Sequence, residues 1–294
     1  MMLRPRSGRG YPLSVASNME CIGLAAGDRA EFARLIEQTL SSADLIAKVN
    51  RTSVYAWQDP SGARLVISTE DRQIVDLLPS FAGTVGALLS GVKVANDEVA
   101  VGKVVDDEGE TMTMLAIELE QRRMLAGAAP AGGAASIVAL GNEVSVFADK
   151  DSFANSDASL ISPGKDAGDP PAHVAELGMS WPPRMAAESF MSYGVFGPPE
   201  QAQAHAWLYG TVLTAQTRTT QLTGQSFITT RVRTVGFEVD LCLPATSAVP
   251  EPGNIIGGHV FLVASMPSLL GSDAARSSKR SWLPWRRGPR TSAS

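Results

Sequence analysis

The stretch SFITTRVRTVGFEVDLCL, residues 226–243, decides the fold class. Its second part, residues 237–243, alternates apolar side chains with acidic ones, as a β-strand does when one face lies toward a core. The first part, residues 226–234, alternates as well, and Gly236 interrupts the pattern between the two. These runs therefore predict two consecutive β-strands. In the second strand four side chains are expected to point inward: Phe237, Val239, Leu241 and Leu243.

Similar runs flank this stretch at residues 206–214 and 259–264. A glycine lies inside the first of them, and proline and glycine residues precede the second. Four or five strands within about 65 residues resemble the OB-fold type, a five-stranded barrel that binds oligomers on its open face. We therefore expect residues 204–268 to form a small OB-like β-barrel or a meander.

Residues 19–125 predict a separate α+β domain. Residues 20–25 have the pattern of a short strand, and Asp28 followed by Glu31 is typical of a helix start with a capping box. Six short β-rich runs follow, at 45–49, 54–57, 64–69, 92–94, 99–105 and 111–119. A helix that lays its apolar stripe on antiparallel strands gives a two-layer sandwich.

One hairpin in this domain has a family likeness. The run VYAWQDPSGARLV, residues 54–66, resembles the strand–Asp-Pro-x-Gly–strand hairpin of vicinal oxygen chelate domains. That family holds its metal through histidine and glutamate on the inward faces of its strands. Residues 19–125 contain no histidine, so the metal chemistry of the family is not carried over.

The segment 126–203 is expected to connect the two domains. Residues 126–135 are almost entirely alanine, glycine and proline, which is typical of a linker. Two short strands are expected at 136–140 and 143–148, with a turn at Gly141. Prolines and glycines break residues 151–189 into an irregular connection.

The two ends of the chain are basic. Nine of the 25 lysine and arginine residues lie in residues 1–18 and 276–294, which contain no acidic residue, so the segment between them carries a net charge of −14. We expect residues 1–18 to be a disordered arm or an over-called start before Met19, and residues 269–294 to be a disordered tail. Trp282 and Trp285 lie among the cations of that tail, which could touch an anionic surface such as a membrane or nucleic acid. The net negative charge of residues 19–275, the acidic body of the chain, makes nucleic acid an unlikely partner for that segment.

Phe227, Arg231 and Arg233 are the candidate ligand-binding residues. They share one face of the strand at 226–234, a pattern with which barrels stack bases and hold phosphates. The competing interpretation pairs the two arginines with Glu238 and Asp240 on the next strand, and we prefer it because the body is acidic.

The other reactive side chains predict no metal site, no cofactor and no assignable catalytic residue. Residues 149–157 supply four oxygen ligands but lack the central glycine and closing glutamate of a calcium loop. His173 and Glu176 are too few for zinc, and His205 and His259 are expected to be ordinary polar residues at strand edges. Cys21 and Cys242, the two cysteines, each lie in an apolar run and are expected to be buried and reduced.

Two functional hypotheses follow. The first is a non-catalytic binding or assembly module in the cytoplasm, which acts through its surfaces on a protein partner or as a homo-oligomer. The second is an enzyme or small-molecule-binding protein with a pocket between its domains. Binding of single-stranded nucleic acid by the C-terminal barrel is a third, weaker possibility.

Overall fold

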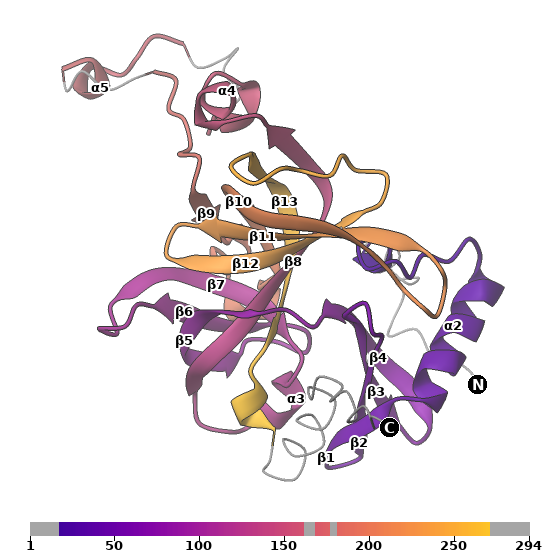
Figure 1. Ribbon diagram of the computed structural model, residues 1–294. Helices are drawn as coiled ribbons and strands as arrows, with labels where there is room; N and C mark the ends of the chain where they lie inside the picture. Colours follow the sequence, from indigo (N-terminus) through magenta and orange to yellow (C-terminus); the bar gives the residue numbers. More distant parts are fainter. Residues whose placement is uncertain (1–17, 162–167, 177–180, 271–294) are drawn as a thin grey trace, which may run out of the picture.

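A computed structural model describes residues 18–161, 168–176 and 181–270 (Figure 1). It contains a four-stranded sheet with one long helix, a larger barrel and several short helices. The predicted α+β class with a β-barrel is confirmed in this coarse form. Apart from Asn18, the predicted N-terminal arm lies outside the described residues, as does the basic tail beyond Leu270.

The four-stranded sheet is antiparallel, with its strands in sequence order. Its members are β1 (Asp44–Val49), β2 (Thr52–Gln58), β3 (Ala63–Glu70) and β4 (Gln73–Phe81). The helix α2 (Arg29–Ser41) buries Leu35 and Ile36. Figure 1 shows this sheet and helix together on one side of the barrel.

The predicted start of α2 is confirmed. The Asp28 side chain accepts hydrogen bonds from the backbone N–H groups of Ala30 and Glu31, which satisfies two donors that have no partner inside the helix. The Glu31 side chain accepts from the N–H of Gly27 rather than from that of Asp28. The capping arrangement is therefore displaced by one residue from the predicted box.

The strand predicted at residues 20–25 is wrong. These residues form a tight turn in which the N–H of Leu24 donates to the carbonyl of Met19, and Gly23 has a φ of +69°. A Cβ at Gly23 would lie 2.6 Å from Oγ1 of Thr220, so close approach also requires glycine here. The apolar side chains that suggested a strand are buried by this turn.

The Asp59–Gly62 turn closes the β2–β3 hairpin as predicted, with Trp57 opposite Leu65. Asp59 is also buried at 3% exposure, and its second carboxylate oxygen accepts from the N–H groups of Gln221 and Leu222. These residues belong to the connection between two barrel strands. The same turn therefore joins the small sheet to the barrel.

The barrel is a closed ring of eight strands, with the edge strand β9 (Ser189–Met191) added beside β10. Four strands come from the first half of the chain: β5 (Val85–Val94), β6 (Ala100–Val105), β7 (Thr111–Leu119) and β8 (Ala131–Phe147). Four come from the second half: β10 (His205–Thr219), β11 (Ser226–Thr234), β12 (Phe237–Pro244) and β13 (Ile255–Ser265).

This set of barrel strands corrects the predicted domain organisation in two places. Residues 85–119, assigned from sequence to the N-terminal domain, pair within the barrel, and the expected five-stranded barrel over 204–268 is only half of a larger one. The expected linker, 126–135, enters β8, which runs through Gly141 without a turn. Small residues suit this path, because a Cβ at Gly132 would lie 3.1 Å from the carbonyl oxygen of Leu89 on β5.

The two sets of four barrel strands have the same connectivity. In each set the first strand pairs with the second and fourth, and the second pairs with the third, always antiparallel. The third strand of each set pairs in parallel with the fourth strand of the other, as β7–β13 and β12–β8. The two fourth strands pair with each other, with Val138 opposite Val263. The barrel therefore has an approximate internal two-fold repeat.

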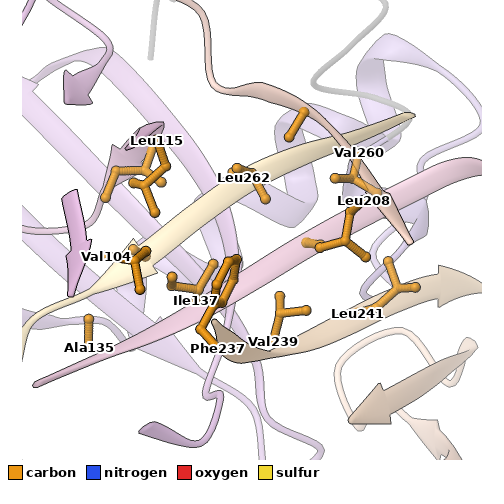
Figure 2. Close-up of a cluster of buried hydrophobic side chains, with 14 of the residues drawn as sticks. Val104, Leu115, Ala135, Ile137, Leu208, Phe237, Val239, Leu241, Val260 and Leu262 are labelled. Atoms are coloured by element: carbon orange, nitrogen blue, oxygen red, sulfur yellow. The ribbon is translucent and has the colours of Figure 1, made fainter. Parts of the chain in front are cut away.

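Two hydrophobic clusters hold the molecule together. One fills the barrel with side chains from both sets of strands, including Leu115, Ile137, Leu208 and Phe237 (Figure 2). It also contains all four side chains of β12 that were predicted to point inward. The other lies between the four-stranded sheet and the outer face of the barrel, where Val138 and Val263 are buried. The small sheet thus covers the site where β8 and β13 pair.

Candidate functional site

Phe227, the first predicted ligand-binding residue, is fully buried. It belongs to the cluster between the four-stranded sheet and the barrel, and its ring packs edge-on against Phe81 with 6.1 Å between centroids. The face of β11 that carries this side chain is thus covered by the small sheet at this end of the strand. A covered ring cannot stack on a base.

Arg231 lies on the same strand face and is paired on several sides. Its guanidinium lies 3.0 Å from a carboxylate oxygen of Glu238 and 3.0 Å from one of Asp240, and it also donates to the carbonyl of Thr84. Asp240 is 8% exposed, and burial raises its pKa while Arg231 lowers it. This arrangement ties β11 and β12 to the chain that leads into β5.

Arg233 is more exposed and meets a different acid from the ones expected. Its guanidinium lies 3.0 Å from Glu188, whose carboxylate also accepts from the hydroxyl of Thr211. These two contacts hold the pKa of Glu188 below its usual range. The structure therefore places the three candidates on one strand but does not bring them together as an open site.

A cluster of six ionisable side chains lies between β3, β4 and the end of β7. We call it the interlayer charge cluster; its members are Arg64, Asp76, Glu118, Glu120, Arg122 and Arg123. Arg64 lies 2.9 Å from Glu120, which also accepts from Ser80, and Arg122 pairs with Asp76. Its cations and carboxylates thus bind one another across the two layers.

Glu118 is the unusual member of this cluster. Burial raises its pKa to about 8; Arg122 opposes the rise, and the nearby carboxylates of Asp76 and Glu98 add to it. The side chain is therefore mostly protonated at neutral pH. Asp240, which also has a raised pKa, occupies the equivalent position in the other strand set, since Glu118 lies opposite Val263 and Asp240 lies opposite Val138.

The remaining sequence candidates are a helix-capping aspartate, the two cysteines and His173. Asp149 caps the short helix α4 (Lys150–Ala154) by accepting from the N–H of Ser152. Both cysteines are buried and belong to no disulfide, and burial raises the pKa of the Cys21 thiol to about 12. The side chain of His173 lies outside the described part of the structure. Among the described residues, no three histidine, cysteine, aspartate or glutamate side chains converge as a metal site requires.

A group of aromatic and imidazole rings lies on the outer face of β10 and β13. We call it the aromatic–imidazole surface and define it by Tyr193, His205, Trp207, His259 and Phe261. Tyr193 comes from the short helix η3 (Tyr193–Val195), and the others come from β10 and β13. His259 is exposed and the other four side chains are half-buried.

Strand register brings these rings together. Trp207 is opposite His259, and His205 is opposite Phe261. The Trp207 and His259 rings meet edge to face at 5.0 Å between centroids, and Tyr193 is 5.8 Å from His259 and 6.3 Å from His205. The neighbouring strands continue this register: Met191 on β9 is opposite Trp207, and Glu143 on β8 is opposite His259.

Both neighbouring parts of this outer face are covered. On one side Phe153 of α4 packs on Tyr209 with 4.7 Å between ring centroids, in a cluster that also buries Ile255. On the other side Val263 lies beneath the four-stranded sheet. The aromatic–imidazole surface is the stretch between these two covers.

Sequence reasoning treated His205 and His259 as unrelated residues. The signal that could have linked them is alternation, because His205 and Trp207 share one strand face, as do His259 and Phe261. Pairing of these strands in antiparallel register then joins the four rings. Tyr193, which arrives from an irregular segment, gave no periodic signal.

Comparison with known proteins supplies no relative: no family model, no curated protein and no solved structure matches this chain. Within the described residues, none of the helices combines the length and the apolar character needed to cross a bilayer. The function is therefore inferred from the site itself.

Proposed function

We propose that this chain is a non-catalytic assembly module, and that its aromatic–imidazole surface contacts a second copy of the chain. The observation that carries the proposal is the group of five rings, one exposed and four half-buried, that lies between two covered parts of the barrel wall. Tryptophan and tyrosine are enriched at the centres of protein interfaces, where they combine a large apolar area with a polar tip.

A second copy is the simplest partner for such a surface. In a two-fold contact the same patch lies on both sides, so it must supply its own donors and acceptors. This patch contains the Tyr193 hydroxyl, which can donate, and the neighbouring Glu143 carboxylate, which can accept. The two cysteines, which form no disulfide, are in keeping with action in the reducing cytoplasm, which is part of the proposal.

The alternative functions have less support. An enzyme or small-molecule-binding protein would use the region between the layers, but the three arginines there are paired with Asp76 and Glu120. Nucleic-acid binding by β11 would need Phe227 to be accessible, whereas this ring is fully buried.

Sedimentation velocity over a concentration series at neutral pH tests the proposal. The native chain should sediment faster as its concentration rises, and Trp207→Ala should weaken the association at least tenfold. Met114→Ala is the matched control, because Met114 is 50% exposed on β7, outside this surface. Monomeric native protein throughout the series, or equal loss in both variants, would refute the proposed function.

A further inference from the structure

The hydrogen bonds of His259 identify the tautomer of its neutral ring. Its Nε2 faces the indole N–H of Trp207, and its Nδ1 lies 3.3 Å from the hydroxyl oxygen of Tyr193. An indole nitrogen can only donate, so Nε2 must accept and must carry no proton. The ring proton of neutral His259 is therefore on Nδ1 and is donated to Tyr193.

We infer that the Trp207–His259 contact is a proton-sensitive latch, which releases the Trp207 indole when His259 takes up a second ring proton. That proton would come from solvent and bind Nε2, the nitrogen that accepts from Trp207. Two N–H groups would then face each other without an acceptor, and the hydrogen bond would be lost. Histidine is the side chain that ordinarily changes charge between about pH 5 and pH 8.

The ionisable groups around His259 allow its ring to bind a second proton. Glu143, opposite on β8, attracts a positive imidazole. Burial lowers the pKa of His205 on β10, and His259 lowers it further, so a second positive ring beside His259 is disfavoured. Burial raises the pKa of Tyr193 on η3, which keeps it a neutral phenol. The three residues of β9 carry no charge.

The rearrangement is confined to Trp207. Protonated His259 still has an N–H on Nδ1 for Tyr193, and η3 is anchored independently because Ser192 accepts from the N–H of Ala116 and Gln203 donates to Gly194. The latch would therefore alter one aromatic side chain of the surface and leave the barrel intact. Its consequence, weaker self-association at acid pH, rests on the proposed function.

Nuclear magnetic resonance of dilute, ¹⁵N-labelled chain tests the latch. The indole N–H resonance of Trp207, assigned from its loss in Trp207→Phe, should move toward the position of a free indole as pH falls from about 8 to about 5. His259→Gln should abolish this movement, because the glutamine carbonyl accepts at any pH. His205→Gln is the matched control and should keep the transition.

A second measurement covers the case in which acid unfolds the chain. The ring ¹⁵N shifts of His259 at about pH 8 should show the tautomer with its proton on Nδ1. The opposite tautomer, or a Trp207 resonance that stays constant in folded protein down to about pH 5, would overturn the latch. If the resonance titrates but the chain never self-associates, the latch stands and the proposed function fails.

Discussion

Replacing Glu118 with glutamine tests whether this carboxyl is protonated in the folded protein. Burial raises its pKa to about 8, above the ordinary value of 4.5. Between these two values the folded state holds a proton that the unfolded state has released. The free energy of unfolding should therefore fall as pH rises through this interval, and the loss should be complete above pH 8.

The size of this effect follows from the same two values. A pKa difference corresponds to about 1.4 kcal/mol per pH unit. From 4.5 to about 8 the loss attributable to Glu118 is then about 5 kcal/mol at most. Glutamine resembles the protonated carboxyl and cannot ionise, so Glu118→Gln should remove the loss.

Urea denaturation at a series of pH values from about 5 to about 9 measures the difference. Glu118→Gln should match the native chain near the acid end and become progressively more stable toward the alkaline end. Glu110→Gln is the control, since Glu110 is exposed in the turn before the same strand. A Glu118→Gln curve parallel to that of the native chain, or lower at about pH 9, would refute the reasoning.

Further predictions concern the ion pairs, the thiols and the close strand contacts. Arg231→Ala should lower the free energy of unfolding, measured by urea denaturation, by about 3 kcal/mol, because it leaves the buried carboxylate of Asp240 without its ion pair. Arg233→Ala removes a half-exposed pair with Glu188 and should lower it by about 1 kcal/mol or less. Equal losses in the two variants would contradict this. Both cysteine thiols should resist a thiol reagent in the native chain and react after unfolding, given their burial; rapid native labelling would contradict it. Gly257→Ala should lower the free energy of unfolding by at least about 2 kcal/mol, because the new Cβ would lie 1.9 Å from the carbonyl oxygen of Leu208. Gly197→Ala is the control and should lower it far less, since no atom lies nearer than 3.8 Å to its Cβ. Similar melting of the two variants would contradict the close contact between β10 and β13.

Local sequence patterns predicted much of the secondary structure. The cap of α2, the Asp59–Gly62 turn and the strands β10 to β13 depend on neighbouring residues, which a sequence pattern records. The pattern failed at residues 20–25 because an apolar run of that length suits a buried turn as well as a strand. It failed at residues 126–135 because alanine and glycine carry little strand preference, although their small size suits the crowded path of β8.

The barrel and the candidate site depend on pairings between distant strands. The internal repeat leaves only a faint trace in the sequence: Ile117, Glu118 and Leu119 of β7 correspond to Val239, Asp240 and Leu241 of β12. Such short matches were not recognisable before the strands were placed. The rings of the aromatic–imidazole surface likewise meet across long stretches of chain, with a sequence separation of 52 residues from Trp207 to His259 and of 66 from Tyr193 to His259, so register rather than spacing creates the site.

Hydroxyl-radical footprinting of the chain at low and high concentration tests the central claim, that the aromatic–imidazole surface is the assembly surface. Trp207 and Tyr193 should become protected from oxidation as the concentration rises. Met112 and Met114, which are exposed on β7, should remain as reactive as before. Unchanged reactivity of Trp207 and Tyr193 in the associated state, with protection of the two methionines instead, would contradict the account.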